Sequence, residues 1–316
     1  MTKMTRRGVL GIAAGAAAAV ATPSAAPAQG PPRRDGVTTI VLITGANGSA
    51  GGDPELTLRG HRTVGVELPG HGLRDAQFRR SYQAPQNLAR LATERSPMAG
   101  VTLDDYAEAA VRVVRRAAEL GPVIAWAGSM GGATLNRVAN EVPRLLKRIV
   151  YSSAFCCVDL PRMADYLQLP EARESMILEL GSAGIGDPAV IGASRTNFRT
   201  NDLTMLAKMK QALCADATDA EFLAMLNGMH PDESIEVPLA DTRGHVDTWG
   251  TIPRTFIRHT RDRIIPLALQ DRMIAGADRA TPHNKFEVRS VATSHAPDVE
   301  GWAATINIVD ELARRR

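Results

Sequence analysis

The sequence has only three cysteines, and none of them belongs to a pattern that binds metal. They are Cys156, Cys157 and Cys214, without a C-x-x-C pair or a Cys/His cluster at zinc-ligand spacing. The glycine-rich run 48–52 lacks the G-x-x-x-x-G-K-S/T pattern of a phosphate-binding loop. We therefore expect the protein to work without a metal ion or a bound cofactor.

The sequence also lacks a strong charge of either sign. Its formal net charge is +3, and residues 1–28 contain Lys3, Arg6 and Arg7 but no acid, so the chain without them is formally neutral. A basic patch is the usual mark of proteins that bind nucleic acid or anionic membranes. The composition gives no reason to expect either partner.

The N-terminal apolar run, Gly8–Val20, is too short to span a bilayer about 30 Å thick. The pair Arg6-Arg7 precedes it, and Ala26-Pro27-Ala28 follows as an A-x-A cleavage site. Together they predict a twin-arginine (Tat) export signal, cut after Ala28, with a flexible untargeted N-terminus as the alternative. We expect a periplasmic or secreted protein that is not stably inserted in a membrane.

Export leaves two alternatives for the cysteines. Oxidising compartments allow disulfides, and Cys214 is then expected to pair with Cys156 or Cys157. The other alternative is that all three thiols are free, small and buried.

Strand-like and helix-like segments alternate along most of the chain. Residues 37–43 form a continuous run of β-branched and apolar residues, typical of a strand buried on both faces. Thr102 is a predicted N-cap for a helix that ends at Gly121-Pro122. The pattern predicts strands at 37–43, 63–66, 123–127, 148–151, 254–259 and 285–288, and helices at 104–120, 129–141, 266–275 and 297–313. It indicates an α/β fold with a mostly parallel central sheet and helices on both faces.

The alternation stops between about 153 and 250, where helix-like segments occur without a convincing strand. We interpret this region as a helical cap inserted in the sheet domain. The predicted organisation is a signal at 1–28, a linker at 29–36, sheet domain at 37–152 and 252–316, and the cap at 153–251. Six of the eleven methionines lie in the cap region, and their pliable side chains weakly favour an apolar substrate over simple helix packing.

The strongest local motif is Gly128-Ser129-Met130-Gly131-Gly132, between an apolar strand and a helix. A nucleophile elbow has this context, because a sharp strand-to-helix turn needs small neighbours and exposes the serine hydroxyl. Ala127 stands where G-x-S-x-G has its first glycine, which is a mild departure. The alternative is a glycine-rich turn that only packs the helix against the sheet.

With this motif the chain resembles the α/β-hydrolase superfamily, and within it the branch of plant methylesterases, hydroxynitrile lyases and related bacterial esterases. The resemblance covers roughly residues 37–314 and is weakest at 73–100 and in the cap. The matching segments stand in the order of that branch: 41–46, 66–72, 128–132, 256–266 and 294–297.

The resemblance implies a catalytic triad in the order Ser129, Asp262, His295. His295 would act as general base, and Asp262 would hold its tautomer. Asp159, after the preceding strand, is a competing acid. Position in the motifs implies that the backbone N–H groups of Ala46 and Met130 form the oxyanion hole.

We therefore predict a carboxylic ester hydrolase that acts on apolar small molecules through an acyl-enzyme intermediate. Two alternatives are a hydroxynitrile lyase and a ligand-binding protein with little turnover. The lyases of this branch carry a Lys after the catalytic His and a Thr at the oxyanion position, where this chain has Ala296 and Ala46. The remaining histidines have structural interpretations, although His245 is a candidate for lining the pocket. The sequence indicates no oligomeric state.

Overall fold

A computed structural model describes residues 36–49, 51–72, 77 and 79–315. The predicted export signal lies outside the described residues, as does the predicted linker apart from Gly36. None of the helices within the described ranges is long and apolar enough to cross a membrane.

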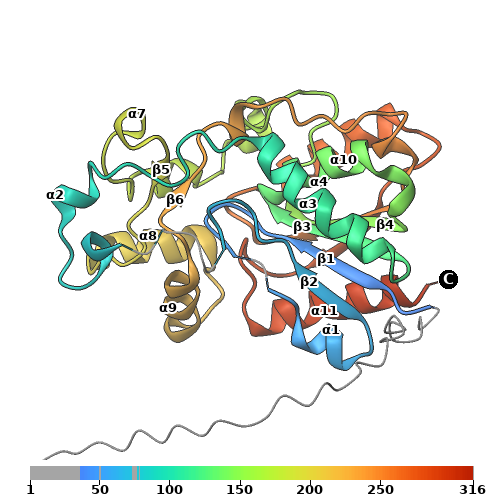
Figure 1. The fold of residues 1–316 in the computed structure, drawn as a ribbon, viewed down its shortest axis with the longest axis horizontal. Helices are drawn as coiled ribbons and strands as arrows, with labels where there is room; N and C mark the ends of the chain where they lie inside the picture. Colours follow the sequence, from blue (N-terminus) through green and yellow to red (C-terminus); the bar gives the residue numbers. More distant parts are fainter. Residues whose placement is uncertain (1–35, 50, 73–76, 78, 316) are drawn as a thin grey trace, which may run out of the picture. The chain divides into compact units, whose positions relative to one another are not determined.

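A six-stranded sheet organises the fold, in the order β2-β1-β3-β4-β7-β8, with every neighbouring pair parallel (Figure 1). Its strands are β1 (Thr39–Ile43), β2 (Arg62–Gly65), β3 (Val123–Ser129), β4 (Arg148–Ala154), β7 (Arg254–His259) and β8 (Glu287–Val291). Each of the six predicted strands corresponds to one of these, and the predicted parallel α/β fold is confirmed.

Helices cover both faces of the sheet. On one face lie α3 (Leu103–Ala118), α4 (Gly131–Glu141) and α10 (Leu267–Ala280), and on the other α1 (Pro54–Leu58) and α11 (Val299–Arg314) (Figure 1). Successive strand residues point to opposite faces. Thus Val41 packs in the core under α3 and α4, whereas Ile40 packs in the core under α11. This explains why both alternating sets of residues in β1 after Thr39 are apolar.

The boundaries of α4 and α10 differ from the prediction for physical reasons. Helix α4 begins at Gly131 because β3 continues to Ser129. Helix α10 continues to Ala280, five residues beyond the predicted end, although Gly276 lies within it. A Cβ at Gly276 would stand 2.8 Å from a carboxylate oxygen of Asp159. The glycine therefore makes room for a packed neighbour and does not end the helix.

Residues 155–253 lie between the paired strands β4 and β7, and we call this segment the insert. It contains the helices α5 (Met163–Tyr166), α6 (Ile177–Gly181), α7 (Pro188–Ile191), α8 (Leu203–Leu213) and α9 (Asp219–Gly228), with 3-10 helices at Pro170–Ala172, Val237–Leu239 and Trp249–Thr251. Outside it are α2 (Leu88–Leu91) and 3-10 helices at Arg80–Tyr82 and Pro143–Leu145.

The expectation of no strand in this region is wrong in one detail. Within the insert, β5 (Ser194–Arg195) pairs antiparallel with β6 (Asp232–Glu233). Each strand has two residues, which is too short for the alternating pattern on which strand prediction relies. Long-range polar contacts of Arg195 and Asp232 hold this pair together.

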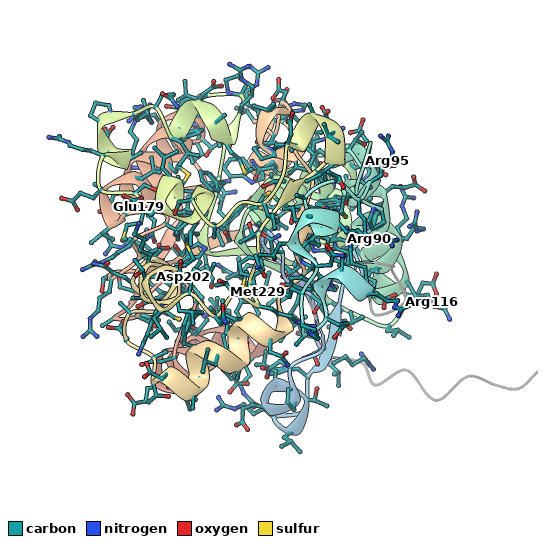
Figure 2. All side chains as sticks on the ribbon, turned by 90° about the vertical axis from the view of Figure 1, so that its left-hand side faces the viewer. Arg90, Arg95, Arg116, Glu179, Asp202 and Met229 are labelled. Carbon is teal, nitrogen blue, oxygen red and sulfur yellow. The ribbon has the colours of Figure 1, made fainter. Side chains whose placement is uncertain are left out.

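The methionines of the insert differ in how deeply they are buried. Met163 and Met209 are buried, whereas Met176, Met205, Met225 and Met229 are partly buried against the same core. Figure 2 shows Met229 near the middle of the face that the insert presents.

Of the two alternatives for the cysteines, the structure shows the second, because all three are free and buried. Their surroundings differ: Cys156 and Cys157 follow β4, and Cys214 caps the C-terminus of α8. Burial raises the pKa of Cys157 to about 12 and that of Cys214 to about 11. The thiols are therefore protonated small core residues at neutral pH.

Candidate active site

Ser129 stands on the sharp turn between β3 and α4. Its φ of 53° is in the left-handed region, which side-chain-bearing residues rarely adopt. A Cβ at Gly131 would collide with the Thr44 carbonyl, and one at Gly132 with the Phe155 carbonyl. The two glycines therefore let α4 start close to the ends of β1 and β4. This is the geometry of a nucleophile elbow, in which local strain exposes a hydroxyl.

His295 joins Ser129 to Asp262 from the loop between β8 and α11. Its Nε2 lies 2.9 Å from Ser129 Oγ, and its Nδ1 lies 2.7 Å from Asp262 Oδ2. A carboxylate can only accept, so Nδ1 carries the proton and Nε2 accepts from the serine hydroxyl. The structure thus brings together the three residues of the predicted triad in the predicted order of contacts.

Asp262 is held in place from both of its oxygens. Its Oδ1 accepts hydrogen bonds from the N–H groups of Ile264 at 2.6 Å and Ile265 at 2.9 Å, while Oδ2 accepts from Ser153 as well as His295. The Asp262 side chain is fully buried. The carboxylate has one possible orientation, with Oδ2 directed at His295.

Ser153 is a site residue that the sequence analysis missed. It lies at a register shift between β3 and β4, where Ser129 pairs with Ala154, and its φ is 39°. This bulge turns the Ser153 hydroxyl toward Asp262. The available signal was weak: a polar Ser152-Ser153 pair after the apolar part of the strand.

His259, at the end of β7, supports the loop that carries His295. Its Nδ1–H donates to the carbonyl oxygens of Ser294 at 3.0 Å and His295 at 3.2 Å. The imidazole is buried, and desolvation lowers the pKa of His259, so it stays neutral at pH 7. The insert supports the same loop, because the Ala296 N–H donates to the Leu213 carbonyl at 2.7 Å.

The two predicted oxyanion donors flank Ser129. Met130 follows it directly, and Gly45 is so close that a Cβ there would stand 2.6 Å from Ser129 Cβ. Ala46 is the next residue. Neither the Ala46 N–H nor the Met130 N–H donates a hydrogen bond to another residue of the described ranges. Two backbone donors beside a nucleophile, without an acceptor among the described residues, match the requirement of an oxyanion hole.

Two alternatives from the sequence lie elsewhere. Asp159 forms ion pairs with Arg272 and Arg279 and accepts from the Tyr166 hydroxyl at 2.5 Å, whereas His295 pairs with Asp262. His245 is exposed, and its N–H bonds to Asn140 near the far end of α4, so it is not placed to line a pocket at Ser129.

The set can transfer a proton from Ser129 to His295 and stabilise an oxyanion without a metal ion. The described part of the chain contains no group of three or more His, Cys, Asp or Glu side chains that could hold one. These are the chemical capabilities needed for nucleophilic acyl transfer.

This fold and site agree with the comparison to known families. The chain belongs to the alpha/beta hydrolase family, whose model matches residues 40–306. No curated protein matches the sequence significantly.

Solved structures with the same fold include esterases. A pyrethroid hydrolase from Sphingobium faniae JZ-2 is 18% identical with a TM-score of 0.64, covering 88% of this chain and 97% of that one. An extracellular α/β-hydrolase from a Paenibacillus species, described as sharing structural and functional homology with tobacco Salicylic Acid Binding Protein 2, is 22% identical with a TM-score of 0.56, covering 86% and 98%. Polyneuridine aldehyde esterase is 16% identical with a TM-score of 0.56, covering 88% and 98%. The predicted membership of the α/β-hydrolase superfamily is confirmed by the family model, and these structures share its fold.

Proposed function

We propose that the protein is a serine esterase that hydrolyses carboxylic esters of apolar small molecules. The observation that carries this proposal is the continuous hydrogen-bond chain from Ser129 through His295 to Asp262. A serine in this arrangement loses its proton to histidine as it attacks a carbonyl carbon.

The proposed reaction has two halves. Ser129 Oγ attacks the ester carbonyl while its proton moves to His295 Nε2, and the N–H groups of Ala46 and Met130 stabilise the oxyanion. His295 then gives the proton to the departing alkoxide, which leaves an acyl group on Ser129. Water deprotonated by His295 attacks the acyl carbonyl, the carboxylic acid leaves, and the proton returns to Ser129.

The apolar substrate class is supported by the surroundings of the site. Ala46 and Ala296, which adjoin the site residues, are partly buried in the same apolar cluster as Met205, Met225 and Met229 of the insert. Flexible methionine side chains suit apolar ligands of varied shape. The names of the neighbours, a pyrethroid hydrolase and polyneuridine aldehyde esterase, agree with apolar esters. A hydroxynitrile lyase is less well supported, because Ala296 provides no cation.

The test is a panel of p-nitrophenyl esters and methyl esters, combined with a fluorophosphonate probe. We expect turnover of several esters, highest for apolar acyl or alcohol groups, and covalent labelling at Ser129 in the wild type but not in Ser129→Ala. Wild-type protein that hydrolyses no ester and takes up no probe would refute the proposal.

We also propose that the protein is exported and acts in the periplasm or outside the cell, on the basis of Arg6-Arg7 and Ala26-Pro27-Ala28. N-terminal sequencing of the exported form is expected to start at or near Gln29. An intact Met1 on cytoplasmic protein, unaffected by replacing both arginines with lysine, would contradict it.

A further inference from the structure

Asn47, which follows the proposed oxyanion donor Ala46, forms three hydrogen bonds with residues of the insert. The Asn47 N–H donates to Glu233 Oε2 at 2.7 Å, and the Asn47 carbonyl accepts from the His230 N–H at 2.7 Å. The Asn47 side-chain amide donates to the His230 carbonyl at 3.0 Å. Asn47 has a φ of 59°, so its backbone is held in a conformation that non-glycine residues seldom adopt.

Glu233 is the centre of this network. It is buried, and its carboxylate also accepts from the Tyr106 hydroxyl at 2.7 Å and the Ser234 N–H at 2.8 Å. His71 lies 3.2 Å away through Nε2, and its Nδ1–H donates to the Gly48 carbonyl at 2.6 Å. Both residues that follow Ala46 are therefore held by one buried network.

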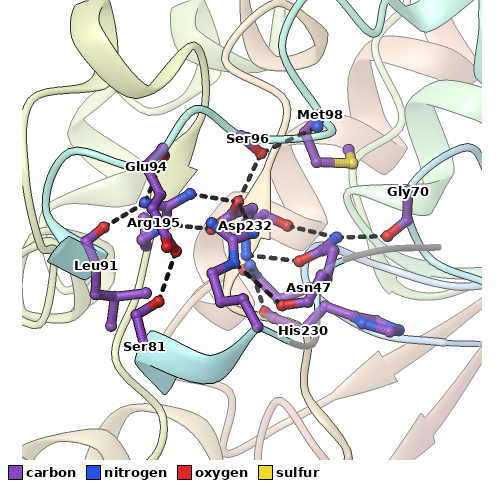
Figure 3. Close-up of polar contacts among 12 residues, drawn as sticks. Asn47, Gly70, Ser81, Leu91, Glu94, Ser96, Met98, Arg195, His230 and Asp232 are labelled. Atoms are coloured by element: carbon purple, nitrogen blue, oxygen red, sulfur yellow. Dashed lines mark hydrogen bonds and ion pairs between the residues drawn. The ribbon is translucent and has the colours of Figure 1, made fainter. Parts of the chain in front are cut away.

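The strand that carries Glu233 is itself fixed. The neighbouring Asp232 is completely buried and forms a two-point ion pair with Arg195 at 2.6 and 2.8 Å. It also accepts from Arg79 at 2.7 Å and Ser96 at 2.6 Å. Figure 3 shows these contacts around Asp232 together with the bonds between Asn47 and His230. Because β6 is anchored on both sides, Glu233 has little freedom to follow a moving loop.

The position of Ala46 depends on this anchor. The Ala46 carbonyl and the Asn47 N–H belong to one rigid peptide plane, so a fixed Asn47 N–H fixes one end of Ala46. The Ala46 N–H can then move relative to Asn47 only by rotation about the φ and ψ angles of Ala46. Misplacing a catalytic group by about 1 Å can lower a rate about 100-fold.

We propose that Glu233 is a positioning residue for the oxyanion hole, and that the hole is complete only while the insert is seated on the sheet domain. Glu233 touches no substrate and acts through Asn47 on the Ala46 N–H. This inference rests on the proposed esterase function and adds a role for the insert in catalysis itself. A purely structural Glu233 would affect folding but not transition-state binding.

The experiment compares Glu233→Ala, Glu233→Gln and the control Glu236→Gln in the full chain. Glu236 lies three residues further along and is exposed, so its variant makes the same charge change outside the network. Three quantities are measured with one p-nitrophenyl ester and one trifluoromethyl ketone: kcat, KM and the ketone's inhibition constant. The ketone forms a tetrahedral adduct with Ser129, whose oxyanion needs the same donors as the transition state. Rates are normalised to the fraction of protein that a fluorophosphonate titrates.

Glu233→Ala is expected to lower kcat about 10- to 100-fold, below the 100- to 1,000-fold loss of an entire oxyanion donor. Ketone affinity should fall by the same factor, and KM should change less than about threefold, since ground-state binding is unaffected. Glu233→Gln should fall in between, because its amide oxygen can still accept from Asn47. Glu236→Gln should match the wild type.

Asn47→Gly provides a second variant if Glu233→Ala does not fold. Glycine accepts the positive φ and loses only the side-chain bond to His230, so the loop becomes less restrained without a steric clash. Its kcat and ketone affinity should fall together, by a smaller factor than in Glu233→Ala.

The inference is overturned if Glu233→Ala keeps wild-type kcat and ketone affinity, or if its kcat falls while its ketone affinity does not. If Glu233→Ala does not fold, the same results in Asn47→Gly overturn it. Wild-type protein that neither hydrolyses esters nor binds the ketone would overturn the esterase proposal, and with it this inference. The two failures are distinguished by the wild-type measurement alone.

Discussion

Replacing Asp262 by asparagine tests the triad more sharply than removing the side chain. Two backbone N–H groups, of Ile264 and Ile265, point at Oδ1. The oxygen of an asparagine must face these donors, so its NH2 group must face His295 Nδ1. An NH2 group donates, and Nδ1 then has to accept, which moves the imidazole proton to Nε2. In that tautomer His295 can no longer take the proton of Ser129.

The expected loss in kcat is about 10⁴-fold, as for other serine hydrolases with a reversed tautomer, equivalent to about 5.4 kcal/mol in the activation free energy. The fold should persist, because the isosteric side chain keeps the two backbone hydrogen bonds. Ser153→Ala is the matched control. It removes one of the four hydrogen bonds to the carboxylate but preserves the tautomer, so a loss of about tenfold or less is expected.

The assay is steady-state hydrolysis of a p-nitrophenyl ester, with thermal melting to verify folding. An Asp262→Asn variant within about tenfold of wild type would refute the tautomer argument. If Asp159→Asn were inactive at the same time, the acid would have to be reassigned to Asp159.

Further variants test the other site residues. Ser129→Ala and His295→Ala should each lower kcat by about 10³-fold or more. The double variant should lose little activity beyond either single variant, since the residues act as a unit. Steady-state hydrolysis of the same ester measures these losses. Ala46→Pro removes a backbone N–H, so kcat and the affinity for the trifluoromethyl ketone should both fall by a larger factor than KM rises. Unchanged kcat and ketone affinity would exclude Ala46 as a donor. The buried His259 has a lowered pKa, so the unfolded state takes up more protons below the ordinary histidine pKa of about 6.5, and the unfolding free energy should decrease as pH falls through that window. Urea unfolding between pH 7 and 5 measures this free energy at each pH, and it should change less with pH in His259→Gln than in the wild type. Equal changes with pH in the two proteins would contradict this assignment.

The positions of the strands and of the nucleophile Ser129 were predictable because their signals are local. The β-branched run before Thr44 and the small residues around Ser129 reflect the burial and steric limits at their own positions. The resemblance to the α/β-hydrolase superfamily indicated Asp262 and His295, and both follow strands whose ends a parallel sheet brings to one edge. The order of motifs in the family then indicated which residues serve as the acid and the base.

The supporting residues were not predictable, because their roles depend on contacts distant in the sequence. Ser153 reaches Asp262 through a bulge that leaves no periodic pattern. Glu233 meets Asn47 across 186 positions, from a two-residue strand. The sequence left the state of the cysteines open for the same reason, because cysteine count and compartment allow a bond but carry no information about distance.

The three buried thiols can be used to measure local unfolding of the protein. Cys214 lies in the insert at the end of α8, while Cys156 and Cys157 adjoin the end of β4. A thiol reagent can modify each one only when its surroundings open, so the modification rate reports the free energy of that opening. If the insert loosens by itself, Cys214 reacts in mild urea while the other two remain protected. If the insert and the sheet unfold as one cooperative unit, all three react at one rate.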